Sequence, residues 1–268
     1  MRAGKGLGVE GGCHVLMVLA RWLFDNPTWF KSLKGPRIIV EHDAYLNFLP
    51  ESPYFKCWTR LYRSCNFDMI ISSGKETTHR LREDGLPAVW VPKGCNKEFL
   101  LVDNTFSRKM GYFASPIAEQ ETGKKFYFYK SRYEMAEELH SNISAVACTV
   151  AEFPSTLSGY SAVVTNDETM REPMAKHFEC SALGCAVIRE RREELADLGY
   201  VNHESVIMYD DWEEMRELCC FYKKRCNRLK LEDIQRKARE VTANQTWDHR
   251  AKQVFEFIKP WVKSRVFI

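Results

Sequence analysis

Two kinds of apolar pattern alternate along the chain. Short runs of β-branched and other apolar residues are typical of buried strands, whereas apolar residues that return every three or four positions are typical of helices with one buried face. In the N-terminal part we predict a strand entering a helix at residues 13–24, strands at 37–40, 67–73 and 88–91, and helices at 53–66 and 76–84. This alternation predicts a parallel sheet with helices on its faces.

The same alternation resumes in the second part of the chain, after a linker at residues 99–109. Here we predict strands at 110–114, 143–150, 161–164, 185–188 and 206–209, and helices at 126–140, 173–183, 212–225, 231–243 and 247–259, the last ended by Pro260. We therefore expect an α/β protein with two Rossmann-like domains facing across a cleft. The predicted parts are an N-terminal domain (1–101), a C-terminal domain (102–246) and a helix (247–268) that returns to the N-terminal domain.

Composition and charge narrow the class of protein. The 268 residues are 45% hydrophobic and 28% charged, which is typical of a soluble globular chain, and the formal net charge of +3 is too small for a nucleic-acid binder. The apolar run at residues 13–24 is interrupted by Arg21, is too short to span a bilayer and precedes no signal-peptide cleavage pattern. We therefore predict a cytoplasmic protein.

Ten cysteines are spread along the chain, and no two of them have CxxC spacing. Zinc sites need close ligand pairs, and disulfide scaffolds are typical of short secreted chains. We predict buried free thiols in a reducing compartment.

The stretch from Glu168 to Ile188 carries the most informative chemistry. Pro173 suits the first position of a helix and Gly184 suits its end, which defines the predicted helix at residues 173–183. The free N–H groups and partial positive charge of a helix N-terminus bind anions.

Charged side chains near this helix start match a nucleotide diphosphate. Arg171, Lys176 and His177 add basic groups within about a turn and a half of the helix start. Glu179, three residues after Lys176, is a carboxylate acceptor for a ribose diol in the same cavity. The alternative is that Lys176 and Glu179 form a solvated surface pair.

Three segments of the second part resemble the donor-binding half of GT-B glycosyltransferases. They are REPMAKHFECSALGCAVI (171–188), VIMYDDWEEMREL (206–218) and TWDHRAKQVFEF (246–257). The resemblance is strongest to the group 1, family 4-like enzymes and their CgeB-like branch. It implies that Glu179 binds the donor ribose, that Lys176 and His177 contact the diphosphate or donor sugar, and that Arg171 and Glu172 line the loop before the helix.

The spacing of two glutamates departs from the usual family pattern. Many family 4 members have two glutamates separated by seven residues, whereas six residues separate Glu172 and Glu179 here. The CgeB-like branch often keeps only the second glutamate.

The segment FDMIISSGKETTHRLREDGLPAVWVPKGCNKEFL (67–100) is similar to the last strand–helix–strand of the acceptor domain in the same enzymes. The resemblance places Pro92, Gly94 and Asn96 at the hinge between domains. The N-terminal domain is shorter than usual, so we expect a truncated form that lacks the first one or two strand–helix units.

Four further residues are candidates for the site. His42 and Asp43 follow a strand, where ligands of open parallel sheets bind, and relatives use this loop to contact the donor sugar or to supply a base. The alternative is a loop histidine with an aspartate cap. Phe153, in a predicted loop at residues 150–155, matches the aromatic residue that holds the base, or else belongs to the core. Ser115 follows a strand and is placed to approach the phosphates.

Asp210 and Asp211 invite a metal-site hypothesis, because glycosyltransferases of the other major fold use an Asp-x-Asp site. Asp211, with Glu214 three residues later, instead matches a helix N-cap. No metal is needed where a helix N-terminus and basic residues neutralise a diphosphate.

Together these patterns predict a metal-independent, retaining glycosyltransferase that uses a nucleotide-diphosphate sugar and needs no cofactor. Its expected partners are this donor and a glycan, protein or small-molecule acceptor, with no nucleic acid and with allowance for peripheral membrane contact. The alternative is a non-catalytic subunit that binds nucleotide sugars, or serves in assembly, on the same fold.

Overall fold

The computed structural model describes the chain in ranges separated by gaps. These ranges are residues 14–17, 28, 31, 36–50, 52–102, 109–112, 139, 143–146, 148–149, 151–165 and 171–263. Contacts divide the chain into two compact units: unit 1 comprises Met1–Pro92 and Ala251–Ile268, and unit 2 comprises Lys93–Arg250. The chain therefore passes between the units twice.

Both passages differ in position from the predicted domain boundaries at 101/102 and 246/247. Residues after Pro92 already belong to unit 2, because Cys95 forms a backbone bridge with Thr246 and Phe99 packs 6.4 Å from Phe153. The apolar pattern contains no sign of this pairing between two loop segments that lie far apart in the sequence.

Unit 1 is built on a parallel sheet of four described strands: β1 (His14–Met17), β2 (Arg37–Glu41), β3 (Met69–Ser72) and β4 (Ala88–Trp90), in that order. In register, Ile39 lies opposite Ile70. The isoleucines of β2 and β3 are at most 1% exposed, so both faces of the sheet are covered. Unbroken apolar runs are the expected pattern for such strands.

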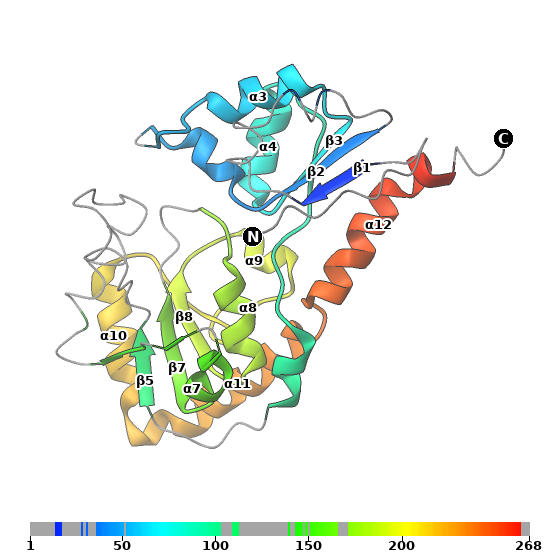
Figure 1. The fold of residues 1–268 in the computed structure, drawn as a ribbon. Coiled ribbons are helices and arrows are strands. Elements are labelled where there is room, and N and C mark those ends of the chain that lie inside the picture. Colours follow the sequence, from blue (N-terminus) through cyan, green and yellow to red (C-terminus); the bar gives the residue numbers. More distant parts are fainter. Residues whose placement is uncertain are drawn as a thin grey trace. The chain divides into compact units, whose positions relative to one another are not determined.

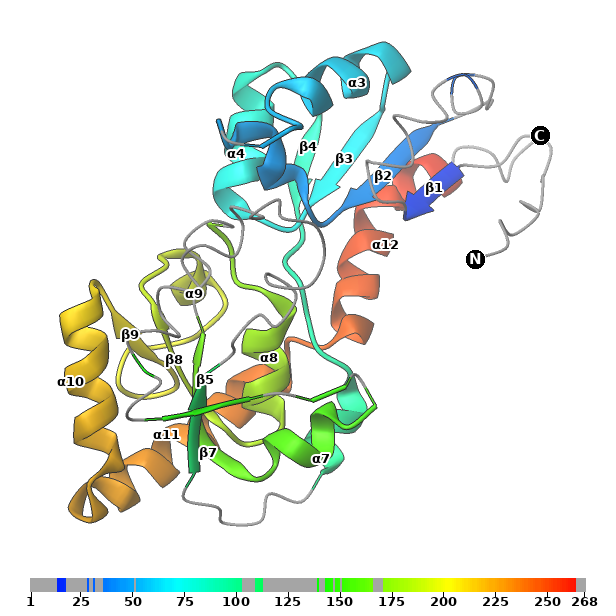
Figure 2. The same ribbon diagram turned by 60° about the vertical axis from the view of Figure 1, so that its left-hand side comes forward.

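Helices cover the two faces of this sheet (Figures 1 and 2). On one face, Val254 and Ile258 of α12 (Trp247–Lys263) pack against the apolar cluster that contains Ile38 and Ile71. On the other face lie α3 (Cys57–Cys65) and α4 (Lys75–Glu83), and η1 (Ala44–Phe48) follows β2.

Two predicted helix limits in unit 1 are wrong. The helix expected from residue 53 begins at Cys57, because Lys56 before it adopts a left-handed conformation (φ 56°) that no α-helix continues. The last helix does not stop at Pro260 but includes it and ends at Lys263. Within α12, Val254 and Ile258 are half-buried, whereas Trp247 and Ala251 are exposed.

Unit 2 is built on a second parallel sheet, with the order β6-β5-β7-β8-β9 in the described residues. Its strands are β5 (Lys109–Tyr112), β6 (Ser144–Ala145), β7 (Tyr160–Thr165), β8 (Ala186–Glu190) and β9 (Ile207–Tyr209). The centre is dry, since Val163, Val164, Val187 and Ile188 are fully buried.

Alternation along these strands sends side chains to two apolar clusters. Val163 and Val187 pack with α7 (Phe153–Leu157) and α8 (Ala175–Ala182). On the other face, Val164 and Ile188 pack with α10 (Trp212–Lys223) and α11 (Arg228–Thr242). Short elements complete the unit: η2 (Lys97–Leu101), α9 (Glu194–Asp197) and η4 (Arg225–Asn227).

Some predicted elements of unit 2 need correction. The strand expected at 143–150 is reduced to β6, the loop expected at 150–155 contains the start of α7, and the linker expected at 99–109 begins with η2. The helix expected at 126–140 lies outside the described residues except for Leu139. None of the helices in the described ranges is long and apolar enough to cross a lipid bilayer.

The described cysteines are free thiols, as predicted, but they are not all buried. Cys65, Cys95, Cys180, Cys185 and Cys219 are buried, and burial raises the pKa of Cys95, Cys185 and Cys219 to about 12. Two others, in α10 and η4, are exposed: Cys220 and Cys226.

Candidate functional site

Two segments that join the units run side by side within unit 2. The N–H of Cys95 donates to the carbonyl of Gln245 at 3.1 Å, and the N–H of Trp247 donates to the carbonyl of Cys95 at 2.9 Å. Between them, Gly94 allows close approach, since a Cβ there would lie 2.7 Å from the carbonyl oxygen of Gln245. Any larger residue would push the two segments apart, which accounts for the glycine.

A buried ion pair connects the first of these segments to the loop before α8. The ammonium group of Lys93 contacts the carboxylate of Glu172, and the two side chains are only 6% and 1% exposed. Lys93 also approaches the sulfur of Met174 at 3.3 Å. The pair therefore holds residues 172–174 in place at the start of α8.

The start of α8 has no side-chain cap among the described residues. Helix α8 begins at Ala175 with Met174 as N-cap, and no side chain in the described ranges caps it. Pro173 is thus outside the helix rather than its first residue, because Met174 keeps an extended backbone (ψ 158°). Uncapped N–H groups at a helix start form an anion site.

Lys176 and Glu179 lie on the partly exposed side of α8. Burial raises the pKa of Glu179, and the nearby Lys176 opposes this shift. The carboxylate of Glu179 accepts no hydrogen bond from any residue in the described ranges. It lies close enough to Cys95 to raise the pKa of that thiol together with burial.

The ring of His177 points into the interior of unit 2. It is 1% exposed, packs 4.6 Å from the ring of Tyr200, and neither ring nitrogen has a hydrogen-bond partner among the described residues. Burial, and secondarily Arg189, holds the pKa of His177 well below 6.5. One residue turns a helix by about 100°, so the position next to Lys176 faces the core instead of the ligand side. This placement does not favour the predicted contact of His177 with a diphosphate.

Arg171 is exposed and adopts a left-handed backbone conformation (φ 51°) next to Glu172. Such a conformation is costly for a residue with a side chain and occurs where the surrounding structure enforces it, often near functional sites. The predicted pair Arg171 and Glu172 is therefore split by the fold: the arginine faces solvent, and the glutamate is buried.

The candidates in unit 1 follow β2, at the carboxyl edge of the first sheet. The hydroxyl of Ser73 donates to the carbonyl of His42 at 3.1 Å, and the N–H of Asp43 donates to Glu41 at 2.9 Å. Asp43 precedes η1 but its side chain makes no capping hydrogen bond in the described part. The alternative of an aspartate cap therefore fails, and the Asp43 carboxylate is available to a ligand.

Of the two remaining candidates, Phe153 is the first residue of α7 and packs at the edge of the apolar cluster that contains Leu157 and Val163. This placement favours the core alternative. Ser115 lies outside the described residues.

Asp210 and Asp211 have structural partners. The N–H of Glu214 donates to the Asp211 carboxylate at 2.8 Å, which confirms the predicted N-cap of α10. Asp210 pairs with Arg191 at 2.7 Å, and this contact lowers the pKa of the carboxyl group.

Sequence reasoning did not select three buried charged residues that surround these candidates. Lys93 pairs with Glu172, Glu41 accepts from Asp43, and Arg250 donates to the carbonyl of Lys93 at 3.1 Å. Lys93 stands between the proline and glycine identified as hinge residues, which was the available signal. No sequence signal distinguishes Glu41 and Arg250. A charged residue at the end of a strand or in an amphipathic helix is ordinarily exposed, so its burial is not expected.

A family model described as "Glycosyl transferase-like" matches residues 146–256. The match covers unit 2 from the residue after β6 onwards, and the first residues of unit 1 that follow Arg250. It includes α8 and the loop that holds Glu172. No curated protein sequence matches the chain.

Several solved structures have a similar fold. Sucrose-phosphate synthase from Thermosynechococcus elongatus has a TM-score of 0.63 at 11% identity, over 93% of this chain and 74% of that one. HepE from Anabaena in complex with UDP-glucose has a TM-score of 0.60 at 12% identity, over 84% and 72%. The pneumococcal O-GlcNAc transferase GtfA in complex with UDP and GlcNAc has 0.53 at 12%, over 87% and 59%.

These likenesses confirm the predicted fold class, a parallel α/β protein of the GT-B type. At such identities they show the fold alone. The family match, which falls on the unit that carries α8, supports the wider GT-B glycosyltransferase assignment.

Proposed function

We propose that this protein transfers a sugar from a nucleotide-diphosphate donor to an acceptor, as a GT-B glycosyltransferase similar to the family 4 enzymes and their CgeB-like branch. Donor binding falls to unit 2, around the start of α8. The likeness to HepE, whose structure contains UDP-glucose, supports a donor of this chemical class.

The state of Glu179 carries the proposal. A half-buried carboxylate that accepts no hydrogen bond within the described ranges has lost part of its hydration without compensation. Its raised pKa reflects this burial. The two hydroxyl groups of a ribose would supply the missing donors and favour the ionised form.

The same end of α8 suits the diphosphate. The uncapped N–H groups after Met174 supply backbone donors, and Lys176 supplies a cation on the side of the helix that carries Glu179. Arg171, exposed in the loop before the helix, is a second candidate cation. A helix N-terminus with neighbouring cations stabilises the charge that develops on a departing nucleoside diphosphate. The chemistry therefore proceeds without a metal in this proposal.

Unit 1 carries two further candidate groups, in the loop after β2. The Asp43 carboxylate makes no side-chain hydrogen bond in the described part, so it can accept a proton or a hydroxyl contact. His42 next to it is a second candidate. Retention of anomeric configuration is proposed from the resemblance to family 4.

A thermal-shift screen against UDP-, GDP- and dTDP-sugars identifies the donor, and calorimetry then measures its affinity for wild-type protein and for Glu179→Gln. We expect the variant to lose about 1–3 kcal/mol of binding free energy, since ribose hydroxyls lose an ionised acceptor. The matched control is Glu213→Gln, which changes an exposed glutamate on α10. Equal affinity of Glu179→Gln and wild type would remove Glu179 from the site.

Turnover separates catalysis from binding. Release of the nucleoside diphosphate in the presence of sugar acceptors should fall strongly in Lys176→Ala and remain unchanged in Lys252→Ala, an exposed lysine on α12. Donor binding without any release from wild-type protein would instead establish the alternative of a non-catalytic nucleotide-sugar-binding subunit.

A further inference from the structure

A cavity of about 760 Å³ opens on unit 2 where the strands of the second sheet begin. Its wall on one side is α11, and on the other it is formed by residues at or just before the starts of three strands. These residues are Met110 of β5, Ser161 of β7 and Gly184 before β8. Gln235 of α11 joins the two sides by donating to the carbonyl of Ser161 at 2.6 Å.

This cavity lies at the opposite edge of the sheet from the proposed donor site. Gly184 follows the C-terminal end of α8, whereas the uncapped N–H groups lie at its start. The eight residues of α8 span about 12 Å. Figure 1 likewise shows α11 crossing unit 2 at the end of the sheet away from the arrowheads. The cavity is therefore a separate site.

The interior of the cavity is apolar and its rim is cationic. Leu100, Met110, Leu231 and Ala243 contribute apolar surface to the wall. Six lysines and arginines line it against two glutamates. A wall of this kind accepts an apolar body, and the excess of cations favours an anion.

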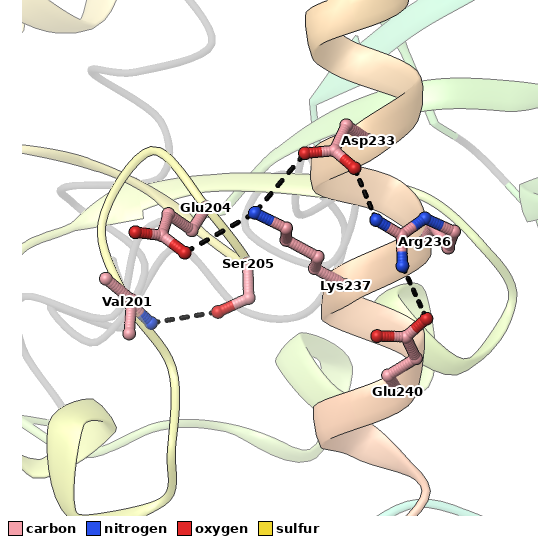
Figure 3. A network of polar contacts seen from close by, with 7 residues as sticks. All are labelled: Val201, Glu204, Ser205, Asp233, Arg236, Lys237 and Glu240. Carbon is pink, nitrogen blue, oxygen red and sulfur yellow. Dashed lines mark hydrogen bonds and ion pairs between the residues drawn. The ribbon is translucent and has the colours of Figure 1, made fainter.

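Most of these cations already have partners on α11 or in neighbouring loops. Arg236 pairs with Asp233 at 2.5 Å and with Glu240 at 2.6 Å, in the network of polar contacts that Figure 3 shows. Arg228 pairs with Glu232 at 2.6 Å. Arg239 donates to the carbonyl groups of Leu100 and Val102.

Of the other three cations, two make no ion pair or side-chain hydrogen bond within the described part of the chain: Lys224 and Arg225. They lie in the turn between α10 and α11, which is held in one conformation by three bonds. The side-chain amide of Asn227 donates to the carbonyl of Phe221 at 2.8 Å, and the backbone N–H of Asn227 donates to the carbonyl of Lys224 at 3.1 Å. The N–H of Lys224 donates to Phe221 at 3.2 Å. Both cations are thus presented by a turn of defined backbone conformation.

Exposed apolar side chains flank the same turn. Leu229 is 78% exposed and Phe221 is 38% exposed, with the ammonium group of Lys230 lying 5.2 Å from the Phe221 ring. Cations interleaved with exposed apolar groups are typical of surfaces that contact anionic lipid.

We propose that this cavity is a binding site for a phosphate-bearing lipid. The phosphate group lies between Lys224 and Arg225, where a guanidinium fork and an ammonium group supply charged donors. The hydrocarbon lies along the apolar wall formed by Leu231 and its neighbours. A phosphorylated sugar suits the site less well, because its hydroxyl groups would face apolar side chains.

Calorimetry with dihexanoyl phosphatidic acid, a soluble short-chain probe, tests the site on the full chain. Lys224→Glu/Arg225→Glu should weaken binding by about tenfold or more, since it removes two charged donors. The matched control Arg60→Glu/Lys252→Glu changes two exposed cations of unit 1 and alters the net charge equally, from +3 to −1 (3 − 4). Ala243→Phe narrows the cavity without changing charge and should also weaken binding.

A second arm identifies the source of the lipid. Phosphatidylcholine vesicles with and without phosphatidic acid are sedimented with each protein. Co-sedimentation that needs phosphatidic acid and is lost in Lys224→Glu/Arg225→Glu shows that the site takes its ligand from a bilayer, whereas calorimetric binding alone shows capture of single lipid molecules. Equal binding by this variant and by Arg60→Glu/Lys252→Glu overturns the proposal, as does the absence of binding in both arms. Donor binding is measured separately, so either outcome leaves the proposed transferase function untouched.

Discussion

The buried contact between Lys93 and Glu172 allows a quantitative test of how the first joining segment is held to the loop before α8. Lys93→Met keeps most of the volume of the side chain and removes only its charge. Because the two side chains are 6% and 1% exposed, water cannot take the place of the lost ammonium group. The variant removes the Lys93 ammonium group from its contact with the buried Glu172 carboxylate.

Breaking a buried ion pair by removing one partner costs about 3–5 kcal/mol. Unit 2 contains 158 residues (250 − 93 + 1). For a domain of this size each 1 kcal/mol lowers the melting temperature by about 2–4 °C. We therefore expect Lys93→Met to lower the melting temperature by about 6–20 °C, measured by calorimetry, with a matching decrease in the urea midpoint.

Lys97→Met is the matched control. Lys97 lies four residues further along the same segment and also pairs with one acid, Asp248, but its side chain is 61% exposed. Its loss should have a much smaller effect, because water solvates both charges. Replacing both buried partners, in Lys93→Met/Glu172→Met, should recover most of the stability that Lys93→Met loses. Equal melting temperatures for Lys93→Met and Lys97→Met would refute this account.

Three further predictions concern stability. Burial holds the pKa of His177 well below 6.5, so its contribution to stability is present above pH 6.5 and is lost as the pH falls below it, at about 1.4 kcal/mol per unit; urea unfolding of His177→Gln should lack this slope. Gly94→Ala should cost about 1–3 kcal/mol in urea unfolding, because the new Cβ would lie 2.7 Å from the carbonyl of Gln245. Asp211→Ala should cost about 0.5–2 kcal/mol in the same assay, because it removes the cap on the N–H of Glu214.

Two of these predictions have a control variant. His79→Gln, at an exposed histidine, should keep the acid slope of the wild-type protein. Asp211→Asn retains a side-chain acceptor and should be nearly as stable as wild type. A slope in His177→Gln like that of the wild-type protein, or an unchanged stability of Gly94→Ala, would contradict the corresponding argument.

Much of the fold was predictable because local pattern and tertiary structure agree there. The runs at residues 38–40, 162–164 and 185–188 are apolar without interruption, as buried parallel strands require, and the structure places β2, β7 and β8 at them. The cap at Asp211 was predictable for the same reason, since a capping interaction spans only three residues. The predicted first residues of two helices were wrong because a backbone conformation decides where each helix begins. These conformations are the left-handed one of Lys56 before α3 and the extended one of Met174 before α8.

In the candidate site, too, some features follow from the local sequence and others only from tertiary packing. By itself the sequence identified the helix whose start offers an anion site, and it placed Lys176 and Glu179 on one side of that helix, because helical spacing is a local property. Only the tertiary structure turned His177 toward Tyr200 and brought Lys93 to Glu172, across 79 positions of the chain. The elements that pack against a helix decide which of its faces is buried. They also decide which charges from distant parts of the chain meet. Local sequence patterns contain neither piece of information.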